Sequence, residues 1–160
     1  MTGTSIHMRE QQYEQIKSVL ASLRLDTANH VLLLIDKSGQ LIAEQGDISN
    51  LDTTSLASLA AGNVAATNGM AHLIGEKEFP TLSHEGEHAG IHICVIGRAV
   101  LVVIFDESSS LGLVKLRVKQ AAHLLAAVFD EVVRESSKKT ASDGALFAEI
   151  TDEDIDSLFN

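Results

Sequence analysis

Four residues near the middle of the chain have the types and spacing of metal ligands. His84, His88 and His92 follow one another at intervals of four, and Cys94 comes two residues later. On a helix these histidines would share one face and could hold zinc. Two intervening glycines disfavour a helix, although the residues could still converge in a hairpin. We favour the alternative of two loop histidines and one strand histidine, and we predict no metal site.

Other chemical motifs are weak or absent in the sequence. Arg98 in a β-turn could act as an arginine finger on another enzyme, but an ordinary turn arginine is the preferred interpretation. The acidic run at 152–156 lacks the glycine and closing glutamate of a calcium loop. No GxxxxGK[ST], GxGxxG or GxSxG pattern occurs, so we expect no bound nucleotide, no cofactor and no enzyme activity of the chain's own. Cys94 lies in an apolar run and is predicted to be a buried, inert, reduced thiol.

The composition describes a folded, acidic protein. The chain has 160 residues, 45% of them hydrophobic, one proline and a net charge of −10. This size suggests one domain, and the negative charge argues against nucleic acid as a partner. The first fifteen residues contain no apolar stretch of the kind found in signal peptides, so we expect a cytoplasmic protein. Residues 53–75 carry too many polar groups to insert into a membrane.

Periodicity predicts an α+β fold in the order α-β-β-α-β-β-β-α. Helices are expected at 9–25, at 53–75 and from residue 109 or 110 to beyond 132, and hairpins at 30–44 and 91–105. A further short strand near Leu82 would lie at an edge, open to pairing with a second copy. The economical arrangement is one five-stranded antiparallel sheet between helices.

Residues 53–75 contain no Asp, Glu, Lys or Arg. Asp52 is the expected N-cap and Gly75 the expected stop. The predicted core stripe consists of Leu56, Leu59, Ala60, Asn63, Thr67, Met70, Ala71 and Ile74. The opposite face is small and uncharged, whereas solvated helix faces normally carry charges. We predict that it binds a partner through Ser58, Ala61, Gly62, Ala65, Gly69 and His72. The alternative is that both faces are buried within one domain.

The last predicted helix has an unfavourable order of charges. Lys115, Arg117 and Lys119 come early and acidic residues come late, which opposes the helix dipole and suggests that the charges serve a surface. The predicted core face of this helix consists of Leu113, Leu116, Gln120, Leu124, Ala127 and Val128, continuing to Val132.

We divide the chain into a domain at 1–136, a flexible linker at 137–146 and an acidic amphipathic segment at 147–160. The linker is inferred from the polar sequence SSKKTASDG at 136–144. The last segment is typical of a docking peptide, and the alternative is a disordered solubilising tail. Its predicted contact residues are Phe147, Ile150, Ile155, Leu158 and Phe159.

Four segments resemble the roadblock proteins, a longin-like family of dimers found beside small GTPases, and among them the MglB-type roadblock proteins. The segments are LIDKSGQLI at 34–42, LDTTSLASLAAGNVAATNGMAHLIGEKEF at 51–79, LVVIFDESSSLGLVKLRVK at 101–119 and FAEITDEDIDSLF at 147–159. The resemblance implies a homodimer with its central helices side by side and its edge strands joined into one sheet. It further implies a cytoplasmic cell-polarity and motility protein, with a polar location as an option.

The same resemblance implies binding to a Ras-like small GTPase, MglA, in its GTP form. Such a dimer would stimulate GTP hydrolysis by reorienting the GTPase's own catalytic residues, without an arginine finger. The small face of the central helix would then contact the GTPase, and 147–159 would dock on it. Two alternatives stay open: a scaffold that tethers the GTPase or another polarity factor without stimulating hydrolysis, and a zinc-dependent hydrolase built on the histidines.

Overall fold

The two most continuous apolar runs of the sequence pair with each other at the centre of the structure. They form β1 (Val31–Asp36) and β5 (Ala99–Asp106), which are antiparallel from Val31 opposite Ile104 to Asp36 opposite Ala99. Their side chains alternate between the two faces of the sheet, and most of them are buried. A strand that is apolar at every position suits such a place, because both of its faces are covered.

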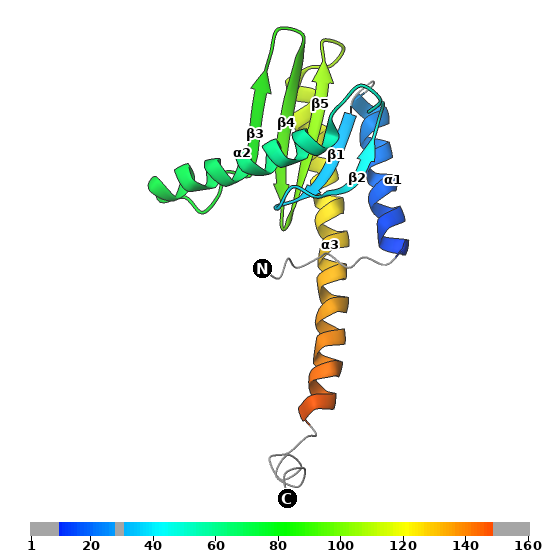
Figure 1. Cartoon of the computed structure of the whole chain (residues 1–160). Coiled ribbons are helices and arrows are strands. Elements are labelled where there is room, and N and C mark those ends of the chain that lie inside the picture. Colours follow the sequence, from blue (N-terminus) through cyan, green and yellow to red (C-terminus); the bar gives the residue numbers. More distant parts are fainter. Residues whose placement is uncertain (1–9, 28–30, 149–160) are drawn as a thin grey trace, which may run out of the picture.

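The computed structural model describes residues 10–27 and 31–148, in the predicted order of helices and strands (Figure 1). The sheet has the order β2-β1-β5-β4-β3, and all neighbours are antiparallel. The predicted α+β class, the five-stranded sheet and the edge position of β3 are therefore confirmed. The remaining elements are α1 (Glu10–Thr27), β2 (Leu41–Gln45), α2 (Thr53–Leu73), β3 (Thr81–Glu85), β4 (Ala89–Ile96) and α3 (Leu111–Ala148).

Helices cover both faces of the sheet. On one face, α1 and α3 pack over Leu32, Leu34, Leu101 and Val103. On the other face, α2 crosses the strands and packs over the alternate side chains, among them Leu33 and Val102 (Figure 1). Each face thus has its own hydrophobic cluster, and the central strands belong to both.

The predicted core stripe of α2 is wrong in part. Leu59, Met70 and Ile74 are 71%, 58% and 70% exposed. The helix instead turns a narrow, small stripe toward the sheet, because small side chains let its backbone approach a surface already filled by leucine, isoleucine and valine. Ala61, predicted for the partner face, belongs to this buried stripe. Its members are Ala57, Ala60, Ala61, Val64, Thr67 and Ala71.

The predicted core face of α3 is also wrong over most of its length. Leu113, Leu116 and Leu124 are 36%, 52% and 59% exposed, and Gln120 and Ala127 are exposed too. The buried stripe lies about one residue further along, at Val114, Val118, Ala121 and Leu125, and it meets the predicted face at Val132, which is buried as expected. Both stripes are apolar at helical spacing, so periodicity alone could not choose between them. The side chain of Val128 is partly buried, as expected.

The backbone of α3 continues to Ala148, through the segment predicted as a flexible linker. Alanine and lysine in this segment are good helix formers, and its Gly144 costs only about 1 kcal/mol relative to alanine. The polar composition therefore indicated a solvated segment and not a break in the helix. Beyond the sheet, α3 runs on alone (Figure 1).

The ends of α2 are as predicted. The Asp52 carboxylate accepts a hydrogen bond from the backbone N–H of Ser55 at 3.0 Å, which satisfies an amide that has no partner within the helix. Gly75 follows the last turn with a φ of +83°, in the left-handed region that glycine enters without strain. Both signals are local, so the sequence was sufficient to place them.

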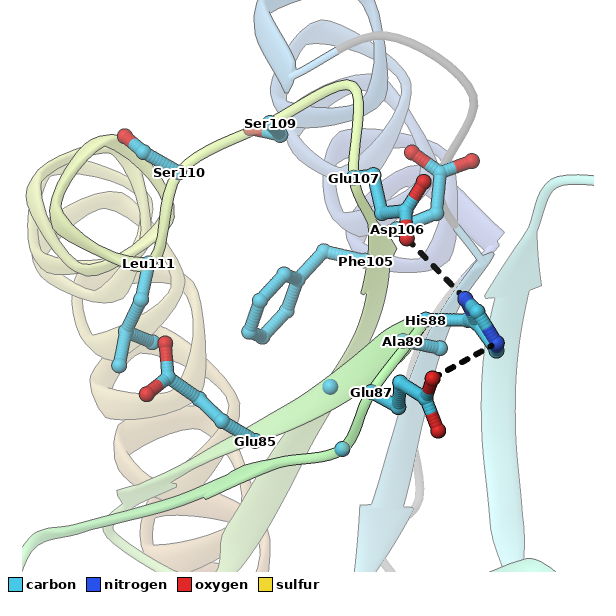
Figure 2. A pocket seen from close by; sticks show the side chains of 12 residues that line it. Glu85, Glu87, His88, Ala89, Phe105, Asp106, Glu107, Ser109, Ser110 and Leu111 are labelled. Carbon is cyan, nitrogen blue, oxygen red and sulfur yellow. Dashed lines mark hydrogen bonds and ion pairs between the residues drawn. The ribbon is translucent and has the colours of Figure 1, made fainter.

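Gly90 of β4 lies directly beneath the ring of Phe105. Figure 2 shows this ring lying between Leu111 of α3 and the strand that carries Ala89. A Cβ atom at Gly90 would collide with the ring and would lie 2.9 Å from the backbone oxygen of His84. The close contact between β4 and β5 here depends on the missing side chain.

His92 is a buried polar residue on the α3 side of β4, and its Nδ1 lies 2.7 Å from Oγ of Ser83 on β3. Burial lowers the pKa of His92, and the Lys115 cation lowers it further, against a backbone hydrogen bond at Leu82 that raises it. Folding therefore favours the neutral imidazole.

We predict that Gly90→Ala destabilises the fold by about 1–3 kcal/mol, because the added methyl group overpacks a site bounded by backbone. Gly112→Ala is the matched control: a Cβ there meets nothing within 4 Å, and alanine in a helix should stabilise by up to about 1 kcal/mol. Urea unfolding midpoints measure both changes. Equal midpoints for the two variants would contradict the proposed overpacking.

We predict that protonation of His92 favours unfolding. Because its pKa is lower in the folded protein, the unfolded chain binds more protons as the pH falls through the ordinary value of 6.5. The free energy of unfolding should fall there by at most about 1.4 kcal/mol per pH unit from this group. Urea titrations between pH 5 and 7.5 should give a shallower dependence for His92→Gln than for the native chain. Parallel curves would contradict this assignment.

Candidate functional site

The outward side of α2 is the most unusual surface of the described chain. It carries no charged residue, and its exposed side chains form two adjacent stripes along the helix. The small stripe consists of Ser58, Gly62, Ala65, Gly69 and His72, which are all exposed. The large stripe consists of Leu59, Met70, Leu73 and Ile74, of which Leu73 is 87% exposed. An uncovered apolar helix side of this kind indicates an interface.

The small stripe is open to close approach. A Cβ placed on Gly62 or Gly69 would meet nothing within 4 Å, so no part of the described chain fills the space above them. Near the start of the stripe, the turn between β1 and β2 reaches α2, and a Cβ on Gly39 would lie 3.1 Å from Cα of Ser58. The small stripe is thus an uncharged, sterically open strip of helix surface that begins beside that turn.

The large stripe, apart from Leu59 near the start of the helix, lies where α2 runs beyond the sheet. The C-terminal end of α2 passes β3 and projects past the edge (Figure 1). There Met70, Leu73 and Ile74 are exposed, although large apolar side chains at a helix end normally rest on a core. Asn63, seven residues before Met70, connects α2 to the edge strand, because its Nδ2 lies 3.2 Å from Nε2 of His84.

The edge strand itself is unprotected. In β3 only Leu82 is partly buried, and the other four residues are exposed. An edge strand presents unpaired backbone N–H and C=O groups that can pair with another strand. The edge of β3 and the overhanging end of α2 are neighbours, so one partner could cover both.

The three histidines do not form a site. His84 faces α2 through Asn63, whereas His92 shares the α3 face of the sheet with Cys94. His88 lies in the exposed turn between the two strands, 3.1 Å from a Glu107 oxygen (Figure 2). The three rings therefore lie in three different places: one on each face of the sheet and one in the turn. Among the described residues, no group of three His, Cys, Asp or Glu side chains is placed to hold a metal ion.

The turn around His88 is rich in carboxylates, and two of them lie beside the ring of His88 itself. Glu87 and Glu107 lie 3.8 Å and 3.1 Å from the two ring nitrogens of His88, and all three side chains are exposed (Figure 2). Exposed pairs of this kind contribute between 0 and about 1 kcal/mol. The hollow of 290 Å³ beside them lies between this hairpin and the segment that joins β5 to α3.

The other predicted reactive residues stand apart from α2. Burial raises the pKa of the Cys94 thiol, with a further contribution from Glu78, which disfavours the nucleophilic thiolate. Cys94 lines a hollow of 590 Å³ between the sheet and α3, whose walls are largely apolar and whose charged members are Lys115 and Lys119. Arg98 is exposed in the turn between β4 and β5.

The predicted docking segment is only partly reached by the structure. The backbone at Phe147 belongs to the last turn of α3. Ile150, Ile155, Leu158 and Phe159 lie outside the described residues, and their role stays a prediction. None of the helices described combines the length and hydrophobicity needed to cross a membrane.

Two surface features were missed at the sequence level: the large stripe of α2 and the exposed leucines of α3. In both helices the large residues were assigned to the core. A signal was present, because the small residues at 57, 60, 64, 67 and 71 alternate strictly between spacings of three and four. That regularity is typical of a helix side packed against a flat surface.

Comparison with known proteins agrees with this architecture. Residues 17–105 match the Roadblock/LC7 domain family. MglB of Myxococcus xanthus is 49% identical, with a TM-score of 0.74, over 79% of this chain and 96% of that one. The gliding protein MglB of Thermus thermophilus is 35% identical, with a TM-score of 0.75, over 81% and 99%. An MglB structure described as having a tetrameric arrangement is also 35% identical, with a TM-score of 0.76, over 82% and 99%. The chain therefore belongs to the Roadblock/LC7 family and, within it, to the MglB-type roadblock proteins.

Proposed function

We propose that this chain is a homodimeric activator of a Ras-like small GTPase of the MglA type, acting in cell polarity and motility. The observation that carries the proposal is the uncharged outward side of α2, with two adjacent stripes of different size on an MglB-type chain. Two stripes suit two partners, a second copy and the GTPase. The function is regulatory, in the cytoplasm, with enrichment at a cell pole as part of the proposal.

The second copy covers the C-terminal part of the large stripe, which consists of Met70, Leu73 and Ile74, and the β3 edge. Pairing of β3 with its counterpart joins the two five-stranded sheets into one, and satisfies the open backbone groups of Thr81–Glu85. The same two-fold arrangement lays the overhanging ends of α2 beside each other, so Leu73 and Ile74 lose their exposure to water. Burying a leucine or isoleucine side chain is worth about 1.5–3 kcal/mol, which favours association.

The GTPase binds the small stripe. At Gly62 and Gly69 the absence of side chains lets another backbone approach α2 closely, and Ser58 and His72 supply polar contacts at the two ends. Because the stripe has no charge, docking on it requires no desolvation of a carboxylate, ammonium or guanidinium group of this chain. Ala61 is excluded from these contacts, since it is buried against the sheet.

Activation of this kind needs no catalytic side chain from the platform. The dimer must only bind the catalytically competent conformation of the GTPase better than the idle one. Each 1.4 kcal/mol of such preference accounts for about a tenfold change in rate. Arg98 plays no part in this mechanism, which positions the GTPase's own arginine and glutamine.

The direct test is single-turnover GTP hydrolysis by the cognate GTPase, alone and with increasing amounts of this protein, with complex formation followed in parallel. Stimulation that saturates with complex formation supports the proposal. Binding of the GTP-loaded form without stimulation would make the chain a scaffold, and no binding to any GTP-loaded candidate would exclude both functions.

We predict that Gly69→Arg abolishes GTPase binding and stimulation while leaving the dimer folded. The added side chain has room in the free chain but occupies the space into which the GTPase must come. Gly112→Arg is the matched control, because it places the same change on an open helical glycine on the other face of the sheet. Calorimetric titration and the hydrolysis assay measure the effect. Normal stimulation by Gly69→Arg would contradict the proposed surface.

We predict that removal of residues 147–160 weakens the complex. A tethered second contact acts at an effective concentration in the millimolar range when its linker suits the span, so its loss should raise the dissociation constant by about tenfold or more. Surface plasmon resonance with the full and the shortened chain measures this. An unchanged dissociation constant would assign the segment to a solubilising role.

A further inference from the structure

The hollow of 590 Å³ between the sheet and α3, here called the α3 hollow, is apolar along most of its walls. Cys94 and Ile96 line it from β4, and Val118, Ala122 and Ala126 line it from α3. It lies on the opposite face of the sheet from α2, so neither partner proposed for α2 covers it. Its volume and its walls are those of a small-molecule site.

Two ammonium groups stand at the α3 hollow. Lys115 and Lys119 line it from successive turns of α3, and both are exposed. Among the side chains that the structure describes, no carboxylate forms an ion pair with either lysine. Lys115 acts on His92, whose pKa it lowers, while Glu78 places one negative charge near Cys94. The hollow is therefore positive on balance, in a chain whose net charge is −10.

These features select an apolar molecule with one acidic end. The α3 wall is about 16 Å long from Lys115 to Ala126, with the lysines toward one end and the alanines toward the other. An anionic group needs charged partners, which the lysines supply, whereas a hydrocarbon chain needs none. A peptide would bring N–H and C=O groups into the apolar part, where the walls offer few partners for them. A hydrocarbon chain fits this part better.

The acidic segment at the end of the chain does not suit the α3 hollow of the same chain. The distance from Ala148 back to Lys119 along α3 is about 43 Å. Residues 149–160 span at most about 43 Å when fully extended. The segment would use its whole length to reach the lysines, so none would remain to place its apolar side chains in the hollow.

We propose that the α3 hollow binds the free anion of a straight-chain fatty acid. Its carboxylate lies between Lys115 and Lys119, and its hydrocarbon chain lies along Ile96 and Ala126. The charge of the lysines is complementary to the acid, and the apolar walls remove the chain from water. This binding does not rest on the proposed GTPase function, so the failure of one leaves the other untouched.

The test is calorimetric titration of the full-length chain with octanoate, decanoate and dodecanoate, each below its micelle concentration. Dodecanoate should bind one molecule per chain, with a dissociation constant of about 1 mM or lower. Each additional buried methylene should tighten binding by up to about fourfold, so the affinity should rise along the series. No binding of dodecanoate, or an affinity that does not depend on chain length, would overturn the proposal.

The role of charge is tested with two lysines of the same helix. Lys119→Gln should weaken dodecanoate binding by about twofold to fivefold, because an ion pair at the surface is lost. Lys138→Gln is the matched control, since Lys138 is exposed on α3 but does not line the hollow. Both variants have the same net charge, so equal affinities would overturn the proposal.

The place of the hydrocarbon chain is tested with two neighbouring alanines. Ala126 is half-buried and lines the α3 hollow, whereas Ala127 is exposed and lines a different one. Ala126→Leu should weaken dodecanoate binding at least about tenfold, because the larger side chain displaces two or more methylenes of the ligand. Ala127→Leu should bind like the native chain. Equal affinities of these two variants, with circular dichroism showing both folded, would overturn the proposal, and the lysine variants decide if Ala126→Leu does not fold.

Other occupants are tested with phosphatidylglycerol vesicles and with a chain that lacks residues 149–160. We expect no binding to the vesicles and an unchanged affinity of the shortened chain for dodecanoate. Vesicle binding without dodecanoate binding would assign the α3 hollow to a lipid surface. Tighter dodecanoate binding after the removal would assign it to the acidic segment. Either result would overturn the proposal.

Discussion

The pairing of β1 with β5 is the interaction on which the rest of the structure depends. These strands are apolar at almost every position and bury side chains on both faces of the sheet. Neither face can be left to water, so α2 must cover one and α1 with α3 the other. The outer strands extend this centre, and β3 is left at the open edge. The positions of the proposed contacts follow from this arrangement of one sheet between helices.

Both long helices have more apolar surface than the sheet can cover. In α2 and in α3, the stripe turned inward consists mainly of alanine and valine, and larger residues such as Met70 and Leu124 stay outside. A helix that is apolar on two sides exposes one of them to water, which lowers the solubility of the protein unless another surface covers that side. The uncovered apolar sides of the two helices therefore lie on opposite faces of the sheet.

The elements themselves were predictable from local signals. The N-cap at Asp52, the glycine at 75 and the two-residue turn at Gly97 and Arg98 each act through their own backbone, and the predicted helices and strands before residue 136 lie close to the observed bounds. The helix faces were not predictable in the same way. Leu59 and Leu116 have the hydrophobicity of core residues, and only the flat surface of the sheet excludes them.

The sequence by itself determined the order of elements, the buried centre of the sheet and the uncharged character of α2, because these depend on periodicity, turn chemistry and composition. Tertiary structure alone decided which side of each helix meets the sheet, and placed His84 and His92 on opposite faces. Two further features appear only in the structure: α3 continues through a polar segment to Ala148, and the end of α2 projects beside the β3 edge. The reason is physical: hydrophobicity drives a side chain toward any apolar surface, but the shape of that surface selects among stripes of equal period.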